Sequence, residues 1–386
     1  CQALNAAMRG VVKSLLNSGE QVEIYGFLDG YRGLIYGNFR MLNWSDFSGI
    51  LTKGGTILGS SRTPFKTIKD PDENGLDKVD AMLQTYHKLR LDCLVVLGGN
   101  GTHKTANLLR ENGLNVITLP KTIDNDLMVT DHTPGFGSAA KYVAITMKEI
   151  LRDVSVYTTK AVTIVEIMGR DAGWLTASAA LCSLSDGKGA DLIYLPECDF
   201  DPEEFISSIK RLQEDHPAIL VAVSEGIRFG DGRYVGEGLG GRKVDAFGHV
   251  ALSGAGRVLE DLVKERLGCK VRSIELNLPQ RCASHIASKT DIDESVGVGR
   301  AAVEAAVSGK TAVMMTINRA DGEEYSVFFD SADIAGIANG VKQVPREFIN
   351  KEGNHITDEC VKYLAPLILG EVFPEYENGL PRHIVL

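Results

Sequence analysis

The sequence has 386 residues, of which 44% are hydrophobic, and its formal net charge at pH 7 is −10. This acidic balance argues against a nucleic-acid partner, which needs a basic face, and the lack of an apolar run of about 18 residues argues against a membrane-spanning helix. One hydrophobic core rarely supports a chain of this length, so two domains are expected.

The chain opens on a predicted helix over residues 3–17, with neither a methionine nor a strand before it. An α/β domain normally places a strand before its first helix, so we expect a short N-terminal segment, including the first strand, to be missing.

Strands and helices then alternate along the chain. The predicted strands are 22–27, 93–97, 115–119, 162–168, 191–195, 218–223 and 271–276. The further predicted helices are 76–89, 102–112, 137–153, 174–183, 202–213, 251–266 and 295–308. The glycine-rich segment 228–248 is expected to form a loop. This alternation predicts an α/β fold with two Rossmann-like parallel-sheet domains and helices on both faces of each sheet.

The strand over residues 93–97 leads into GGNGT (98–102) and then into a helix. Glycines at such a turn let backbone N–H groups and the helix N-terminus face an anion without an obstructing β-carbon. This arrangement is typical of a phosphate cradle.

The next strand, 115–119, is followed by KTIDND (121–126), which places one lysine and two aspartates in a single loop. Further polar residues follow later strands: Arg170 follows 162–168, and Glu225 follows 218–223. Parallel sheets bind ligands at the carboxyl ends of their strands, so these loops are expected to converge. A phosphate cradle beside carboxylates and cations predicts phosphoryl transfer.

Seven cysteines are scattered through the chain without CxxC spacing. An odd number without metal-ligand spacing favours neither a disulfide framework nor a zinc site, and is typical of a reduced cytoplasmic protein.

Several motifs together resemble the A-type phosphofructokinase family. The motifs are DGYRGL (29–34), GGTILGSSR (54–62), GGNGT (98–102), TIDND (122–126), MGR (168–170), SEG (224–226) and PQR (279–281). The resemblance extends from Asn5 to about residue 315. It implies an enzyme with its active site in the cleft between two domains. One domain would comprise 1–135 and about 280–330 and bind the donor; the other would comprise 136–279 and about 331–386 and bind the sugar phosphate.

The resemblance also implies roles for individual residues in transfer to O1 of fructose 6-phosphate. Asp124 would accept the hydroxyl proton, Arg170 would neutralise the transferring group, and Lys121 and Thr122 would assist them. The acceptor would contact Thr122, Ile123, Asp124, Met168, Gly169, Arg170, Glu225, Arg272 and Arg281. The donor would contact Arg62, Thr63, Gly99, Asn100, Gly101 and Thr102. Magnesium would be held at Asn100 and Asp126.

The motifs give conflicting indications of the phosphoryl donor. In the family, glycine at the position of Gly101 leaves room for a nucleotide, whereas pyrophosphate-dependent members carry a carboxylate there. Lys121, by contrast, matches pyrophosphate-dependent members. We expect ATP, because a carboxylate at position 101 would exclude a nucleotide sterically, and its absence is therefore stronger evidence than an additional cation at position 121. Pyrophosphate is the alternative.

Other classes of function remain open. A non-catalytic sugar-phosphate sensor is possible because Asn100 and Leu278 replace the aspartate and histidine often found in the family. An NAD-kinase-like or lipid-kinase-like enzyme would use GGNGT but leave TIDND and MGR unexplained. The family resemblance further implies a cytoplasmic homodimer or homotetramer.

Overall fold

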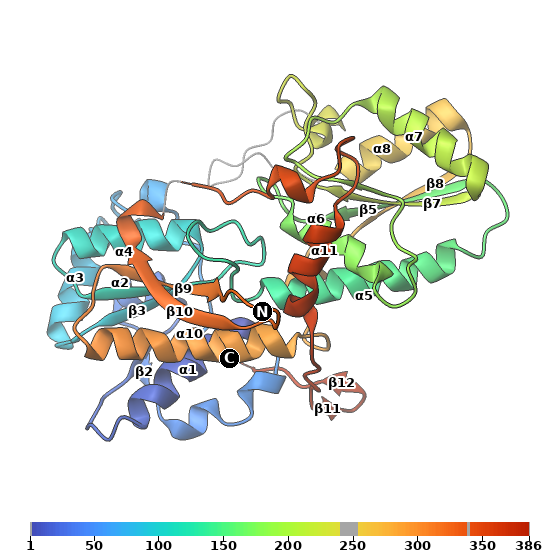
Figure 1. Ribbon diagram of the computed structural model, residues 1–386. Coiled ribbons are helices and arrows are strands. Elements are labelled where there is room, and N and C mark those ends of the chain that lie inside the picture. Colours follow the sequence, from blue (N-terminus) through green and yellow to red (C-terminus); the bar gives the residue numbers. More distant parts are fainter. Residues whose placement is uncertain (1, 240–253, 338–339, 386) are drawn as a thin grey trace.

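The computed structural model of the protein describes residues 2–239, 254–337 and 340–385, which form two lobes (Figure 1). The helices are α1 (Gln2–Leu16), α2 (Tyr31–Tyr36), α3 (Lys78–Lys88), α4 (Asn100–Glu111), α5 (Phe136–Val154), α6 (Trp174–Ala177), α7 (Pro202–Asp215), α8 (Ala255–Leu267), α9 (Pro279–Cys282), α10 (Lys289–Val307) and α11 (Asp358–Leu364). The strands are β1 (Tyr25–Phe27), β2 (Phe39–Met41), β3 (Leu94–Gly98), β4 (Val116–Pro120), β5 (Ala161–Ile167), β6 (Leu192–Tyr194), β7 (Ala218–Ser224), β8 (Lys270–Glu275), β9 (Val313–Arg319), β10 (Val327–Asp333), β11 (Tyr376–Glu377) and β12 (Leu380–Pro381).

The first lobe is built on a four-stranded sheet of order β10-β9-β4-β3. Strands β3, β4 and β9 are parallel, and every residue of β4 is buried, as expected for a strand covered on both faces. Apolar side chains of α1 and α10 cover one face, and those of α3 and α4 cover the other. The carboxyl ends of β3 and β4 lead directly into the two phosphate-type loops.

The second lobe contains a wholly parallel sheet of order β6-β7-β5-β8. Its central strands β5 and β7 are buried along their entire length. Helices α5, α6 and α11 contribute to the core on one face, and α7 and α8 to the core on the other.

A carboxylate from the first lobe caps a helix of the second. Helix α5 begins after Gly135, which has a left-handed φ of 100° and no capping side chain of its own. Asp291 of α10 accepts hydrogen bonds from the backbone N–H groups of Gly135 (2.8 Å) and Ser138 (3.2 Å) instead. A carboxylate is favourable there because it satisfies free N–H groups at the positive end of the helix dipole. This contact ties the two lobes together next to the site.

The fold confirms the α/β prediction with two parallel-type sheets, but several elements differ from expectation. Strands β9 and β10 were not predicted, and β10 is antiparallel, so the first sheet is mixed. The strand expected over 22–27 is shortened to β1, which pairs with β2 in a separate antiparallel ribbon. The helix expected over 174–183 becomes 3-10 after Ala177. Part of the expected loop 228–248 and the first turn of the helix expected over 251–266 lie outside the described residues.

The domain division remains a proposal, and two observations bear on its boundaries. Strand β10 extends the first sheet to Asp333. At the C-terminal end, the Ile384 backbone N–H donates to the Gly54 carbonyl (3.0 Å), so the last described residues pack on the first lobe rather than the second. None of the described helices is long and apolar enough to cross a membrane.

Candidate active site

The loop after β4 forms a tight turn built on its own hydroxyls. Thr122 Oγ1 accepts a hydrogen bond from the Asp124 backbone N–H (3.1 Å) and donates to Asp124 Oδ2 (3.4 Å). Asn125 adopts a left-handed φ of 56° and is fully buried. Asparagine tolerates this conformation better than most residues, which explains its place between two aspartates. The turn thus fixes the direction of Asp124.

Asp124 lies among cationic side chains from three segments of the chain. Burial raises the pKa of its carboxyl group, and the largest opposing influence is the Lys121 ammonium group. The Arg170 and Arg281 guanidinium groups also lower this pKa. Lys121 belongs to the loop after β4, Arg281 belongs to α9, and Arg170 follows β5. The structure therefore brings together four predicted site residues from three segments that are far apart in sequence.

The loop after β5 packs closely on the loop after β7. The Gly169 backbone N–H donates to Glu225 Oε1 (3.3 Å), and Ser224 Oγ donates to the Gly169 carbonyl oxygen (2.6 Å). Gly169 has a φ of 135°, a conformation that L side chains rarely adopt. On the other side, the Met168 N–H donates to Gln280 Oε1 (3.3 Å). These bonds connect the predicted acceptor-binding segments 168–170, 224–226 and 279–281.

Glu225 has a strongly perturbed carboxyl group. Its pKa is raised to about 7, above all by burial and also by the Asp124 carboxylate, whereas the Gly169 N–H and the Arg170 guanidinium act in the opposite direction. The Asp124 carboxylate contributes to this shift, so the two carboxyl groups lie within electrostatic range of each other. Perturbed carboxyl groups of this kind cluster at functional sites.

The glycine-rich turn after β3 forms the N-terminus of α4. Gly99 caps this helix without a side-chain hydrogen bond, which leaves its first N–H groups available to an anion. The Lys121 N–H donates to the Gly98 carbonyl (3.0 Å), so this turn and the loop after β4 are held side by side. The Thr102 carbonyl accepts from the Tyr31 hydroxyl (2.8 Å), which anchors the first turn of α4 on α2.

Gly101 lies on the exposed side of this turn, and a β-carbon built there meets no atom within 4 Å. No neighbouring atom fills the position beside Gly101; nucleotide binding there remains a prediction. Arg62 is exposed and Thr63 is partly buried; their contact with a donor remains a prediction.

Asn100 and Asp126 present oxygen atoms to the same region. Asn100 Oδ1 is buried without a partner, and Asn100 Nδ2 lies 3.4 Å from Asp126 Oδ2. Burial and the neighbouring Asp124 raise the pKa of Asp126 to about 6. No group of three His, Cys, Asp or Glu side chains within the described ranges could hold a metal ion. The pair fits Mg²⁺ that takes most of its ligands from phosphates and water.

Arg272 and Arg281 behave differently, although the resemblance assigns both to the sugar phosphate. Arg281 acts on Asp124, whereas Arg272 is exposed on the edge strand β8, opposite Thr163 of β5. The Arg272 side chain forms no ion pair or hydrogen bond with another described residue. Of these two arginines, the structure brings Arg281 to the Asp124 centre.

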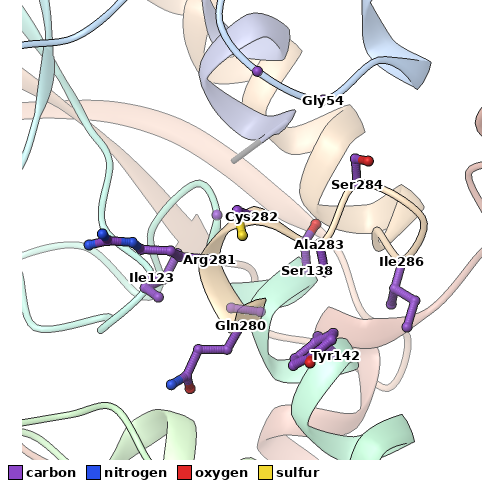
Figure 2. A pocket seen from close by; sticks show the side chains of 13 residues that line it. Gly54, Ile123, Ser138, Tyr142, Gln280, Arg281, Cys282, Ala283, Ser284 and Ile286 are labelled. Atoms are coloured by element: carbon purple, nitrogen blue, oxygen red, sulfur yellow. The ribbon is translucent and has the colours of Figure 1, made fainter. Parts of the chain in front are cut away.

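A cavity of about 110 Å³ adjoins this centre. It lies between Gly54, the first turns of α5 and helix α9. Figure 2 shows Arg281 beside Ile123, with its guanidinium extending away from Ser284. The cavity thus opens behind the residues that surround Asp124.

Sequence reasoning missed Lys342, which donates to Asn125 Oδ1 (3.2 Å) from a segment more than two hundred residues away. No local motif marks this lysine, and the resemblance to the family thins before it. Only the long-range fold reveals its position.

Comparison with known proteins gives a consistent result. The family model described as Phosphofructokinase matches residues 1–306. The pyrophosphate–fructose 6-phosphate 1-phosphotransferase of Halomonas elongata is 41% identical, over 98% of this chain and 92% of that protein. An ATP-dependent 6-phosphofructokinase of Spirochaeta thermophila is 46% identical, but over 58% of this chain and 61% of that protein. The crystal structure of a pyrophosphate-dependent phosphofructokinase from Nitrosospira multiformis superposes with a TM-score of 0.85 and 31% identity, over 99% of this chain and 92% of that one.

Proposed function

The chain belongs to the phosphofructokinase family and is a phosphotransferase, and from this premise we propose that it phosphorylates fructose 6-phosphate at O1. The observation that carries this proposal is the position of Asp124, a partly buried carboxylate in the field of Lys121, Arg170 and Arg281. A proton acceptor surrounded by cations is what transfer of a phosphoryl group to an alcohol requires. A non-catalytic sensor would have no need of this arrangement.

In the proposed mechanism, Asp124 accepts the proton of the O1 hydroxyl as that oxygen attacks the donor phosphorus. The Arg170 guanidinium, whose Nε is buried without a partner, faces the charge that develops on the transferring group. The Thr122 hydroxyl donates to a phosphoryl oxygen once it exchanges its bond to Asp124. Glu225 receives sugar hydroxyls, and Arg281 pairs with the 6-phosphate.

Pyrophosphate is the better-supported donor, which reverses the preference for ATP drawn from Gly101. The Halomonas elongata relative and the Nitrosospira multiformis structure each match nearly the whole chain, and both are named for pyrophosphate. The placement of Lys121 agrees, because burial lowers the pKa of its ammonium and Asp124 raises it. A cation at the junction of donor and acceptor suits a small inorganic leaving group. The reaction would convert pyrophosphate and fructose 6-phosphate into phosphate and fructose 1,6-bisphosphate.

ATP remains the second candidate because of the open space at Gly101. Initial rates with each donor at saturating fructose 6-phosphate decide between them. We expect pyrophosphate to give at least tenfold higher kcat/KM than ATP, and the reverse ratio would overturn the assignment. If neither donor gives product, the proposed phosphotransferase activity is contradicted and a non-catalytic sugar-phosphate sensor is favoured.

Mg²⁺ would be held by Asp126 and Asn100 Oδ1 together with donor phosphates and water. When bound, it supplies positive charge that stabilises the charge developing on the transferring group. Cytoplasmic location and a dimeric or tetrameric state also remain proposals, and sedimentation equilibrium of the purified protein tests the second.

A further inference from the structure

Residues 340–345, which we call the strap, run without regular secondary structure from the first lobe toward α11 of the second. Figure 1 shows this orange-red segment passing between the lobes. Three consecutive strap residues, Lys342, Gln343 and Val344, form hydrogen bonds to active-site loops or to their immediate supports. The strap therefore contacts the parts of the site in both lobes, although it contains none of the motifs identified in the sequence.

Toward the first lobe, the strap holds the loop after β4. The Lys342 backbone N–H donates to the Asp126 carbonyl oxygen (2.8 Å). The Lys342 Nζ donates to Asn125 Oδ1 (3.2 Å) and to the carbonyl oxygens of Thr130 (3.1 Å) and Asp131 (2.5 Å). All three ammonium protons thus have acceptors, and every acceptor belongs to the segment 125–131.

Toward the second lobe, the same strap residues hold the segment after Arg170. The Trp174 Nε1–H donates to the Lys342 carbonyl oxygen (2.8 Å). The Gln343 side-chain amide donates to the Asp171 carbonyl oxygen (3.4 Å). The loop that carries Arg170 is therefore tied to the residue that holds Asn125.

A shared carboxylate adds a third connection. Glu197 Oε1 accepts hydrogen bonds from both the Val344 N–H (2.9 Å) and the Gly173 N–H (2.8 Å). Val344 is buried, and burial raises the pKa of Glu197. A charge-assisted acceptor with two backbone donors fixes the strap firmly against this lobe.

The contact with Asn125 matters because of what flanks it. Asn125 holds a left-handed backbone conformation between Asp124 and Asp126. Relaxation of that residue would turn both neighbouring carboxylates, since side-chain direction follows the backbone. Its side chain is fixed by Lys342 Nζ at 3.2 Å and by the Thr133 hydroxyl at 3.5 Å. The shorter of these bonds comes from the strap.

A buried ammonium is a costly way to hold a turn unless its charge is compensated. Burial lowers the pKa of Lys342 to about 8, and the Asp131 and Asp126 carboxylates oppose this shift. The Lys342 ammonium group thus interacts electrostatically with the Asp126 carboxylate, and the Lys342 N–H also holds the Asp126 backbone.

We propose that Lys342 is a positioning residue for phosphoryl transfer, which holds Asn125 so that Asp124 and Asp126 point at the reacting group while the strap keeps the Arg170 loop in place. This proposal rests on the proposed function. Displacement of a reacting group by about 1 Å can cost roughly 10²-fold in rate. Loss of Lys342 should therefore act on turnover rather than on acceptor affinity.

The test compares Lys342→Met with Arg346→Met, a matched loss of one cation from the adjacent turn. Among the residues that the structure describes, Arg346 donates only to carbonyl oxygens within its own turn, at Ile349, Asn350 and Lys351. Steady-state kinetics and thermal melting are measured for both variants and the wild type. For Lys342→Met we expect kcat to fall about 10–100-fold while KM for fructose 6-phosphate stays within about threefold. For Arg346→Met we expect kcat within twofold, whatever the change in Tm.

Restoration of part of the lost kcat by Lys342→Arg would support the role, because that variant keeps a donor cation. A folded Lys342→Met protein with kcat within twofold of wild type would overturn the proposal. Should that variant not fold, Asn125→Gly decides, since it keeps the left-handed backbone but removes the acceptor; unchanged kcat would then overturn it. The wild-type rate in the same assay reports on the proposed function separately.

Discussion

The backbone of Gly226 lies so close to Arg170 that a β-carbon at position 226 would come within 2.0 Å of the Arg170 carbonyl oxygen. The two loops that present Arg170 and Glu225 are thus packed backbone against backbone. No flexible side chain separates them that could yield to added bulk. The close approach of these two backbones therefore requires a residue without a β-carbon at position 226.

Substitution of Gly226 by alanine should push these loops apart. We expect Gly226→Ala to lower the free energy of unfolding by roughly 1–3 kcal/mol, because overpacking forces the backbone to move. Turnover should fall at least tenfold as Arg170 shifts. Gly336→Ala is the matched control, since a β-carbon there meets no atom within 4 Å. Urea unfolding and kinetics of both variants check the result, and equal behaviour of the two would contradict it.

Removal of the proton acceptor should act on chemistry rather than on binding. Asp124→Asn is expected to lower kcat by roughly 10²–10⁴ because the amide cannot accept the hydroxyl proton. The affinity for fructose 6-phosphate should change only a few-fold, measured by titration calorimetry without donor. Near-normal turnover would remove Asp124 from its assigned role.

The space at Gly101 permits a direct test of donor choice. Gly101→Asp should fold normally, because the added side chain meets no atom and a carboxylate in the first turn of α4 is favourable by about 0.3–1 kcal/mol. It should lower kcat/KM for ATP at least tenfold through repulsion of the nucleotide phosphates, and lower it less for pyrophosphate. Gly101→Asn, similar in shape but uncharged, separates repulsion from bulk. Equal losses with the two donors would show that position 101 does not discriminate between them.

Glu225 should make stability depend on pH. Its pKa is raised from 4.5 to about 7 in the folded protein, so the folded state binds the proton more tightly than the unfolded state. Stability is then lost as pH rises from about 4.5 to about 7. Glu225→Gln should therefore raise the free energy of unfolding by roughly 1–3 kcal/mol at pH 8 and leave it unchanged at pH 4. Denaturant titrations at both pH values check this, and an equal gain at pH 4 would contradict it. Acceptor affinity should decrease at the same time.

The elements that the sequence predicted best are those with a strong local pattern. The fully buried runs of β4, β5 and β7 are predominantly apolar, with Thr118 in β4 and Thr163 and Glu166 in β5, as expected for strands covered on both faces. Strand β10 was not predicted from the sequence because its residues alternate between partly buried and exposed, as on many edge strands. Its antiparallel pairing with β9 depends on tertiary context that no local pattern encodes.

The same distinction applies to the site. Asp124, Arg170 and Glu225 follow strands of parallel sheets, so their convergence could be predicted from the general rule for ligand sites. The separation of Arg272 from Arg281 could not, because nine residues across a strand end leave the direction of each side chain open. Lys342 could not be predicted either, because its role depends on a strap that carries no motif.

The order of the strands has a consequence for biosynthesis. Strand β4 pairs with β9, which is made only after all the strands of the second sheet, and Ile117 must wait for Val313. At a synthesis rate of about 5–20 residues per second, that interval lasts on the order of ten to forty seconds. The second lobe can close during this time, whereas the emerging first lobe displays an unpaired apolar strand edge to solvent. Chaperone protection during translation should therefore matter most for the half of the molecule that the ribosome begins first and completes last.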